Sequence, residues 1–534
     1  MPEISGEKRS EASITSAYIE RIITQIKASD NPTRLKLELA KELQIKSIPS
    51  NLELISELKK RGVESEVIAK LRKKPVKTRS GVTIITVVAP LFSCPHGRCV
   101  YCPGGGSTGI PRSYSGKELQ IMSARELNYE AERQVRRYVE RLESMGHKVD
   151  KVELIIIGGT FTAAPLEFQR EIIKAALDGL HGEESGSLEE AIVRAEKRRP
   201  YISGITIETR PDWAMEKEAD ALLSMGVTRV ELGVQALDDE IYKIINRGHT
   251  VADVARATRI LRDRAFKVCY HLMPGLPGSS PEKDVEMYEE IFSDPRFRPD
   301  MVKIYPLMVM PDTPLYDMWK RGEYKSYSLE TLIEVLVKWL ELTPPYVRIQ
   351  RIRREIPASE AADGKYPGNL RQLVEQELER RGMRCRCIRC REVGNPKALR
   401  RLGEAAMRIE MFETRYETDG GQEIFLSYET PDMSVLFGLL RLRLPYEPAT
   451  QMTENSALIR ELHVYGQMVP VGSYGDGRET WQHRGIGAKL LRRAEELAAE
   501  NGYKQIVVIS GIGVKQYYQR HGYHHHGPYM AKSL

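Results

Sequence analysis

The sequence predicts a multidomain α/β protein that contains a partial (βα)6 barrel, a second and smaller α/β module and an N-terminal helical domain. Three observations lead to this fold class: helical spacing of apolar residues near the N-terminus, apolar runs that alternate with amphipathic segments through the middle, and a glycine turn that enters a helix near the C-terminus. At 534 residues the chain also exceeds one ordinary domain. We therefore divide it into a basic helical domain (1–79), a barrel (80–342), a linker (343–397) and a C-terminal module (398–534).

The first domain is predicted to be helical and basic. Ile19, Ile22 and Ile26 share one helical face, and Leu54 and Leu58 repeat the pattern after a break. Basic residues gather where this domain ends, at Lys70, Arg72, Lys73, Lys74, Lys77 and Arg79. A second basic group follows the barrel, at Arg348, Arg351, Arg353 and Arg354. Each group could contact the phosphates of a nucleic acid, or could equally form a solvated face with local salt bridges.

The barrel is predicted from six apolar runs, each followed by an amphipathic segment, which is the pattern of parallel βα units. The runs cover 82–89, 152–159, 204–210, 227–235, 267–273 and 301–309. In such barrels the chemistry lies at the carboxyl ends of the strands. Polar residues or glycines occupy these ends, at Gly158, Gly159, Thr160, Glu208, Gln235 and His271. We expect them to line a cofactor site.

Three cysteines, Cys94, Cys99 and Cys102, follow the first apolar run and are separated by four and then two residues. A 4Fe-4S cluster usually takes four thiolates, so three without a fourth nearby would leave one iron open to another ligand. The alternative is a structural zinc site, which usually supplies its ligands in two closely spaced pairs. The tyrosine before Cys102 and the glycines after it favour the cluster.

A second cysteine group, Cys385, Cys387 and Cys390, lies in the linker. Together with Cys269 the two groups account for all 7 cysteines, and such clustering indicates metal sites in a reducing compartment rather than disulfides. The spacing favours zinc, with a fourth ligand that the sequence does not identify. A second iron–sulfur cluster and reactive cysteines without a metal are the alternatives.

The C-terminal module contains a glycine turn that enters a helix and lies between two predicted strands. The turn consists of Gln482, His483, Arg484, Gly485, Ile486 and Gly487. It resembles the loop of the GNAT acyltransferases whose backbone N–H groups and helix dipole hold the pyrophosphate of acetyl-CoA. In that family a tyrosine after the next strand lies near the thioester sulfur, and Tyr517 and Tyr518 occupy this region here.

The first cysteine loop resembles that of the radical S-adenosylmethionine (SAM) enzymes, in which SAM binds the open iron and reduction releases a 5′-deoxyadenosyl radical. The order of helical domain, radical SAM barrel, Cys-x-Cys-x-x-Cys linker and GNAT domain resembles the catalytic subunit of the Elongator complex along nearly all 534 residues. The resemblance rests on the segments 94–105, 158–161, 271–278, 385–394, 482–487 and 510–529. It implies a 4Fe-4S cluster, SAM, acetyl-CoA and zinc.

The same resemblance implies that the wobble uridine of transfer RNA is converted to 5-carboxymethyluridine. A radical on the acetyl methyl group would add to carbon 5 of the base, and water would then release CoA. The resemblance also implies that Tyr517 or Tyr518 lies near the sulfur and that Lys303 contacts the adenosyl group. The anticodon loop would bind the two basic groups, because its bases leave their stack more readily than bases in a duplex.

Three other functions stay open at this point. A protein lysine acetyltransferase would use the GNAT domain alone, with Glu461 as its candidate general base. A radical SAM methylthiotransferase or methyltransferase would use the Cys385 group for a second cluster. A non-catalytic scaffold would bind both nucleotide-derived cofactors as sensors of metabolism.

Net charge and hydropathy bear on location. The net charge is +6, and no apolar run reaches the roughly 18 to 20 residues that a membrane-spanning helix needs. The charged N-terminus is unlike a signal peptide. We therefore expect a cytoplasmic protein with no membrane contact that receives electrons from a separate donor. Other Elongator subunits or a second copy of the chain are left open as partners.

Overall fold

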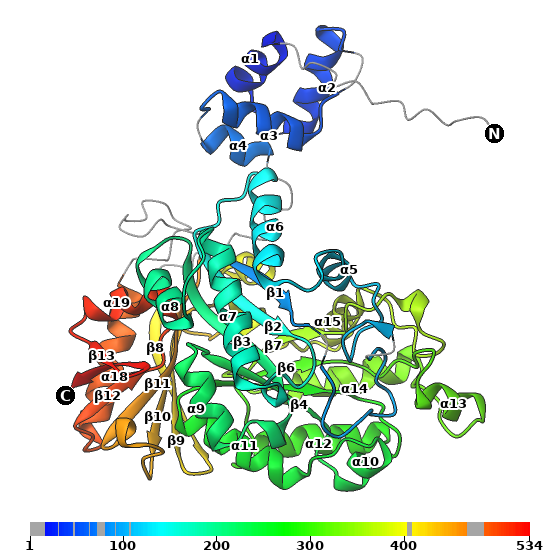
Figure 1. The fold of residues 1–534 in the computed structure, drawn as a ribbon, viewed down its shortest axis with the longest axis vertical. Coiled ribbons are helices and arrows are strands. Elements are labelled where there is room, and N and C mark those ends of the chain that lie inside the picture. The colour runs from blue at the N-terminus through cyan, green and yellow to red at the C-terminus, as the bar shows by residue number, and fades with distance from the viewer. Residues whose placement is uncertain are drawn as a thin grey trace. The chain divides into compact units, whose positions relative to one another are not determined.

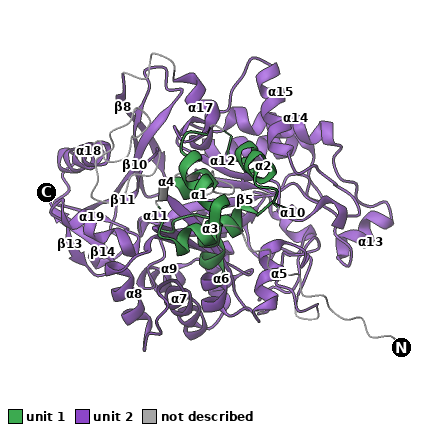
Figure 2. Ribbon diagram, turned by 90° about the horizontal axis from the view of Figure 1, so that it is seen from above, with its two compact units in different colours: residues 1–79, 137–149 green, residues 80–136, 150–534 purple. Residues whose placement is uncertain are grey.

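The computed structural model describes residues 16–29, 31–45, 48–63, 65–71, 81–90, 92–105, 108–402, 408–466 and 485–534. The chain forms two compact units, and each is described by itself (Figure 2). The first contains residues 1–79 and 137–149, and the second contains residues 80–136 and 150–534.

The first unit is helical, as the spacing of its apolar residues predicts. Its helices are α1 (Ser16–Gln25), α2 (Pro32–Glu42), α3 (Asn51–Lys60), α4 (Ser65–Leu71) and the part of α6 (Ala131–Ser144) from residue 137 onward. Ile19 and Ile22 are fully buried in its core with Leu54 and Leu58. The α3 helix begins at a capping box, in which Ser50 and Glu53 satisfy each other's backbone N–H groups.

The second unit contains a parallel sheet of seven strands in sequential order, which is an open barrel (Figure 1). The strands are β1 (Val82–Val88), β2 (Lys151–Ile157), β3 (Tyr201–Thr209), β4 (Arg229–Gln235), β5 (Lys267–Leu272), β6 (Met301–Ile304) and β7 (Arg348–Ile352). Its helices are α5 (Leu119–Glu126), the start of α6, α7 (Leu166–His181), α8 (Leu188–Lys197), α9 (Glu216–Ser224), α10 (Asp239–Ile244), α11 (Val251–Asp263), α12 (Pro281–Ser293), α13 (Pro314–Lys320) and α14 (Leu329–Leu342). Every residue of β4 is buried, as expected for a central parallel strand.

The barrel has one strand more than the six that we predicted. The seventh strand, β7, lies in the segment assigned to the linker and pairs with β6. Its sequence alternates arginines with isoleucines, and only Ile349 and Ile352 are buried. Five residues with three polar positions do not form an apolar run, so the sequence pattern does not predict this strand. The linker also contains α15 (Leu370–Arg380) and α16 (Ile388–Arg391), and α17 (Pro396–Arg401) begins near its end.

A second seven-stranded sheet follows, in the order β13-β14-β12-β11-β10-β9-β8. The strands are β8 (Glu410–Thr418), β9 (Gly421–Glu429), β10 (Leu436–Pro445), β11 (Ser456–Val464), β12 (Gln505–Val508), β13 (His524–His526) and β14 (Tyr529–Ser533). All neighbouring pairs are antiparallel except β11 and β12. The helix α18 (Ile486–Glu500) connects this parallel pair, and the short helix α19 (Lys515–Gln519) follows β12.

The two sheets of the second unit are joined by buried charges and by close backbone packing. The carboxylate of Asp300, at the amino end of β6, accepts a hydrogen bond from the guanidinium group of Arg460 on β11 at 2.9 Å. Both side chains are fully buried. Near β3, a Cβ atom added at Gly511 would lie 2.3 Å from the carbonyl oxygen of Ser203, so only glycine fits. The second sheet therefore contacts the amino ends of barrel strands, whereas the predicted cofactor residues lie at the carboxyl ends.

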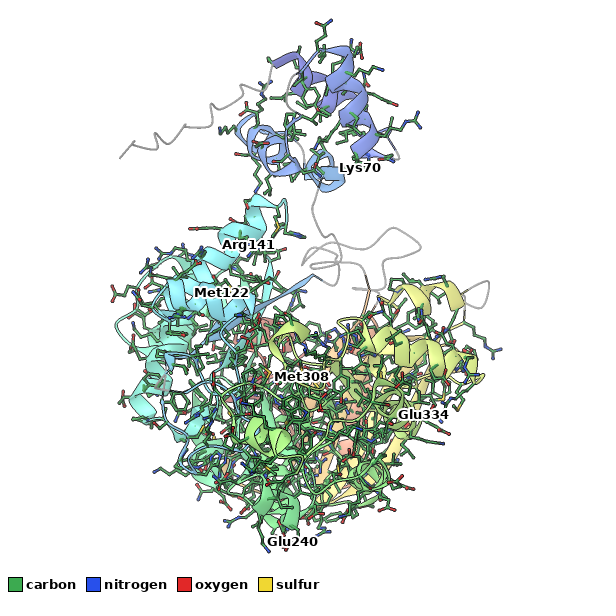
Figure 3. The ribbon with its side chains drawn as sticks, turned by 90° about the vertical axis from the view of Figure 1, so that its right-hand side faces the viewer. Lys70, Met122, Arg141, Glu240, Met308 and Glu334 are labelled. Atoms are coloured by element: carbon green, nitrogen blue, oxygen red, sulfur yellow. The ribbon has the colours of Figure 1, made fainter. Side chains whose placement is uncertain are left out.

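Side chains fill the interior of this unit. In Figure 3 Met308 lies among packed side chains, and it is 5% exposed, whereas Met122 on α5 is 47% exposed. Within the described residues, no helix combines the length and the hydropathy needed to cross a bilayer.

Candidate active site

The cysteine loop lies between β1 and α5, at the carboxyl end of the first strand. Gly158 and Gly159, which follow β2, have φ angles of 147° and 100°, a region in which residues with side chains are strained. A Cβ atom at Gly159 would lie 3.8 Å from the Sγ atom of Cys94. The next residue, Thr160, directs its hydroxyl group toward the same sulfur at 4.0 Å. The predicted Gly-Gly-Thr segment therefore lies directly against the cysteine loop.

The other two sulfurs also have polar neighbours. His96 Nε2 lies 3.1 Å from the Sγ atom of Cys99, and Arg247 Nη1 donates to the same atom at 3.6 Å. Ser113 Oγ lies 3.7 Å from the Sγ atom of Cys102. Hydrogen-bond donors around thiolates, with two of the three cysteines buried, suit the ligand set of an iron–sulfur cluster.

The strands β3 to β6 bring together a cluster of charged side chains. Glu231 is fully buried in β4 and accepts hydrogen bonds from His271 at 2.8 Å and from Lys303. Lys303 also lies 3.5 Å from Glu208. Burial alone would lower the pKa of Lys303, but Glu231, together with Tyr305 and Glu208, raises it above the usual value. Lys303 is therefore a permanent cation, held on β6 by two carboxylates, one each from β3 and β4.

Gln235 ends β4 in a conformation that indicates a functional constraint. Its φ angle is 73°, which is unusual for a residue with a side chain. Gln235 is 8% exposed, and its Oε1 atom has no hydrogen-bond partner among the described residues. A buried amide oxygen without a partner is costly, so it suits a bound polar ligand such as SAM.

The described part of the acyltransferase turn begins at Gly485, since Gln482, His483 and Arg484 lie outside the described residues. Gly485 precedes α18 with a φ angle of 80°. A Cβ atom at Gly487 would lie 2.7 Å from the phenolic oxygen of Tyr517. Gly487, in the described part of the turn, and the half-buried Tyr517 thus meet at the start of α18, where helix N–H groups bind anions. Tyr518 is buried and packs edge-on against Tyr523.

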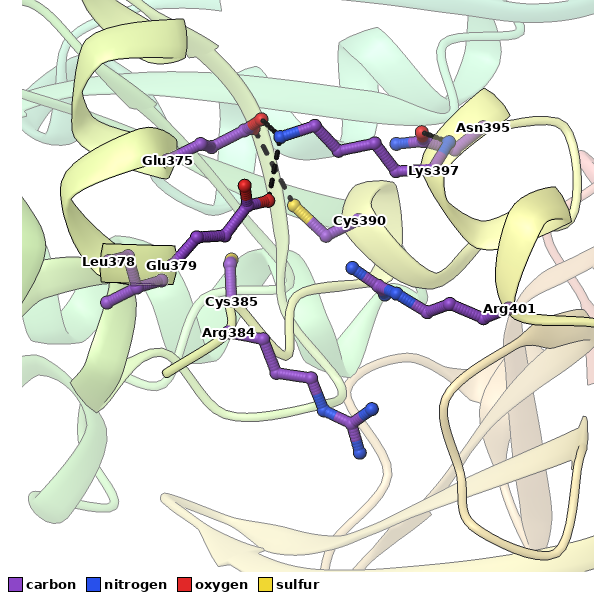
Figure 4. A pocket seen from close by; sticks show the side chains of 9 residues that line it. All are labelled: Glu375, Leu378, Glu379, Arg384, Cys385, Cys390, Asn395, Lys397 and Arg401. Atoms are coloured by element: carbon purple, nitrogen blue, oxygen red, sulfur yellow. Dashed lines mark hydrogen bonds and ion pairs between the residues drawn. The ribbon is translucent and has the colours of Figure 1, made fainter. Parts of the chain in front are cut away.

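The second cysteine group is compact. The Sγ atoms of Cys385, Cys387 and Cys390 all lie within 4.8 Å of one another. Arg371 of α15 donates to the Sγ atom of Cys390 at 3.4 Å. Figure 4 shows Cys385 and Cys390 in a pocket beside Glu375, whose carboxylate lies 3.1 Å from the ammonium group of Lys397.

Comparison with known proteins identifies the two folds. Residues 88–291 match the Radical SAM superfamily, residues 299–380 the Radical_SAM C-terminal domain, and residues 478–533 the acetyltransferase (GNAT) domain. A protein of Methanocaldococcus jannaschii named tRNA uridine(34) acetyltransferase is 44% identical, over 98% of both chains. Elongator complex protein 3 of Bos taurus is 40% identical, over 88% of this chain and 87% of its own. The chain belongs to the Elongator complex protein 3 family.

A solved structure of this family has the same fold. The archaeal Methanocaldococcus infernus Elp3 with an N-terminal deletion of residues 1–46 matches with a TM-score of 0.75 and 42% identity, and the match covers 85% of this chain and 100% of that chain. The predicted fold class, a radical SAM barrel with a GNAT fold, is confirmed. With both domains in one chain, this family member is a transferase, and the two domain types imply a 4Fe-4S cluster, SAM and acetyl-CoA.

The structure gives mixed surroundings to the arginines that we expected to bind RNA. Arg348 is paired with Glu392 at 2.7 Å, and Arg351 with Glu355 at 2.7 Å. Arg353 donates to three backbone carbonyl groups, and Arg354 donates to the carbonyl oxygen of Ser113. In the first unit, Lys70 donates to the carbonyl oxygen of Ser29 at 3.2 Å. The other predicted residues of that group lie outside the described residues, at Arg72, Lys73, Lys74, Lys77 and Arg79.

Sequence reasoning missed four residues of the site in this family member. His96 lies inside the cysteine motif, so the sequence alone predicts that it is close to the sulfurs. Glu231 is a charged residue within an apolar strand, which is a signal for a buried functional group. Arg247 and Ser113 reach the cysteines through the fold, and no local pattern marks them.

Proposed function

We propose that the chain converts the wobble uridine of transfer RNA to 5-carboxymethyluridine, with SAM and acetyl-CoA as co-substrates. The observation that carries the proposal is that the three-cysteine loop and the acetyltransferase sheet belong to one compact unit with a buried ionic junction. The name of the 44% identical relative, tRNA uridine(34) acetyltransferase, supplies the substrate class. The carboxymethyl product is the part of the proposal that goes beyond that name.

The barrel residues hold and orient the radical chemistry. Cys94, Cys99 and Cys102 would ligate the cluster, and the strand-end residues Gly159, Thr160, Glu208, Gln235 and His271 would surround SAM. When bound, the cluster and SAM supply the radical that activates the acetyl methyl group. Lys303, fixed by Glu231 and Glu208, offers a cation and hydrogen-bond donor to the adenosyl group.

The acetyltransferase domain holds acetyl-CoA and releases the thioester. The turn 482–487 would bind the pyrophosphate at the amino end of α18. Burial raises the pKa of Tyr517, so its hydroxyl group stays protonated and can donate to the leaving thiolate. Between the two tyrosines we assign this role to Tyr517, because its oxygen lies beside Gly487 and Tyr518 is packed in the core.

The transfer RNA would contact the chain through its basic groups, Lys70 to Arg79 and the arginines from 348 to 354, with the anticodon loop presented to the barrel. The supporting feature is the exposed Arg351. Its side chain and that of its ion-pair partner Glu355 are each 43% exposed, so the arginine is available to a phosphate. An electron donor, a cytoplasmic location and partner subunits or a second copy of the chain stay predictions.

The test is an anaerobic incubation of the reconstituted protein with unmodified transfer RNA, SAM, reductant and acetyl-CoA labelled in its methyl carbon, followed by mass spectrometry of the nucleosides. We expect labelled 5-carboxymethyluridine from the wild type. We expect none from Cys99→Ala, which lacks one cluster ligand. Arg256→Gln, at an exposed arginine of α11, is the control that keeps the activity.

The rival function, protein lysine acetylation, would give labelled protein, unmodified RNA and no effect of Cys99→Ala. The surroundings of Glu461, the candidate general base, do not favour this rival function. Burial alone would raise the pKa of Glu461, but Lys267 and Arg441 hold it at about 2, which makes this carboxylate a weak base near neutral pH.

We propose that the second cysteine group binds zinc. Three sulfurs within 4.8 Å of one another suit a single ion, because a tetrahedral zinc with bonds of about 2.3 Å holds its sulfurs about 3.8 Å apart. In a four-iron cluster each thiolate binds a different iron, so the sulfurs stand further apart. The neighbouring Arg371 would offset the net negative charge of a zinc ion with three thiolates.

Metal analysis of the purified chain tests this assignment. We expect about four iron atoms and about one zinc atom per chain. Cys387→Ser should lose the zinc and keep the iron, and Cys99→Ser should do the reverse. About eight iron atoms and no zinc per chain would instead support the methylthiotransferase alternative.

A further inference from the structure

Arg247 is a buried cation without a carboxylate partner, and it lies against a cluster ligand. The residue follows α10, is 8% exposed and donates through Nη1 to the Sγ atom of Cys99 at 3.6 Å. Among the described residues, no carboxylate lies within 4.0 Å of its guanidinium nitrogens. A buried charge without a counter-charge is costly, so an anion must lie close to it in the working protein.

The surroundings of Arg247 leave the cysteine sulfur as that anion. Besides the Cys99 sulfur, the guanidinium group of Arg247 donates to the backbone carbonyl group of Gly233, which has no charge. The nearby Arg210 is neutralised by its own ion pair with Asp212. Among the described residues, the sulfur of Cys99, with the group that it would ligate, is therefore the anion in hydrogen-bond contact with Arg247.

The strand β4 is shaped to hold this guanidinium group. A Cβ atom at Gly233 would lie 2.4 Å from Arg247 Nη2, so a side chain at this position would displace the cation. The same nitrogen donates to the carbonyl oxygen of Gly233, and the Nε atom has no hydrogen-bond partner among the described residues. Gly233 therefore leaves room for the guanidinium group and anchors it beside the Cys99 sulfur.

We propose that Arg247 is a positioning residue that raises the reduction potential of the cluster held by Cys99. Reduction adds one negative charge to a cluster that already has anionic ligands, and a buried cation stabilises the reduced form more than the oxidised form. A hydrogen bond to the ligand sulfur acts in the same direction. The inference rests on the cluster of the proposed function, and it does not depend on the RNA substrate.

The test is a redox titration of the reconstituted protein, with dithionite as the electron donor and the reduced cluster followed by electron paramagnetic resonance. In Arg247→Gln we expect a more negative midpoint potential, with at least a tenfold change in the reduction equilibrium, which is about 59 mV for one electron. Arg247→Lys keeps the charge and should stay closer to the wild type. Arg256→Gln, at an exposed arginine of α11, is the matched control and should not shift the potential.

Iron content and visible absorbance show whether each variant still holds its cluster. Equal potentials in wild type and a cluster-containing Arg247→Gln would overturn the proposal. If only Arg247→Lys retains the cluster, the charge itself is required and the proposal is supported. Loss of the cluster from both variants alike would assign Arg247 a packing role and would also overturn it. None of these outcomes depends on carboxymethyluridine formation, so a failure of the proposed function is seen separately.

Discussion

Asp284 on α12 shows how burial changes the behaviour of a single residue. Its carboxylate accepts hydrogen bonds from the N–H group of Gly275 at 2.7 Å, from Ser279 at 2.6 Å and from Tyr327 at 2.9 Å. These bonds hold the loop after β5, which leads away from His271 in the site. Burial raises the pKa of Asp284 to about 6, although the three hydrogen bonds lower it.

We predict that Asp284 makes the second unit less stable as the pH rises. Its pKa is higher in the folded state than the ordinary value of 3.8, so between these values the folded state binds more protons than the unfolded state. From pH 5 to pH 7.5 this group should lower the free energy of unfolding by about 1.4 kcal/mol. Urea denaturation at several pH values, compared between wild type and Asp284→Asn, measures the effect. Asp317→Asn, at an exposed carboxyl group of α13, is the control, and the prediction fails if both variants follow the same pH dependence as the wild type.

At the scale of elements, the sequence predicts long buried strands well and short or charged strands poorly. The run at 82–89 became β1, and the run at 227–235 became β4, because both are rich in apolar residues that parallel strands bury. The run at 301–309 ends early, since β6 stops at Ile304 and Pro306 cannot donate a hydrogen bond to the ladder. The run at 348–352 was missed because its buried isoleucines alternate with arginines.

The sequence predicts which polar residues end the strands, but it does not show which side chains meet there. The spacing of Cys94, Cys99 and Cys102 within one loop is visible in the sequence. The contact of Arg247 with Cys99 joins residues 148 positions apart, and the contact of Lys303 with Glu231 joins residues 72 positions apart. Such pairs depend on which strand ends meet, and only the order of the sheet provides that information.

At the scale of the whole molecule, the second unit depends on a buried ionic junction between its two sheets. Arg460 of β11 binds Asp300 and also donates to Glu423 of β9 at 3.1 Å. Arg441 of β10 lies 3.5 Å from Asp300 and 2.8 Å from Glu461. Asp300 thus forms ion pairs with two strands of the acetyltransferase sheet, and it directly precedes β6, the strand that carries Lys303. We therefore expect the two sheets to unfold together.

We predict that Asp300→Asn destabilises both sheets at once. The substitution leaves two buried arginines with less counter-charge, and breaking a buried ion pair in this way costs about 3–5 kcal/mol. Hydrogen exchange measured by mass spectrometry should show faster exchange in peptides from β5 and β6 and equally in peptides from β10 and β11. Asp419→Asn removes an ion pair with Arg259 that is partly exposed, which is worth about 0–1 kcal/mol, so it should change neither set of peptides. Faster exchange confined to one sheet would show that the ionic junction does not couple the two sheets. The sheets would then be joined by backbone packing, such as that of Gly511 against Ser203 of β3.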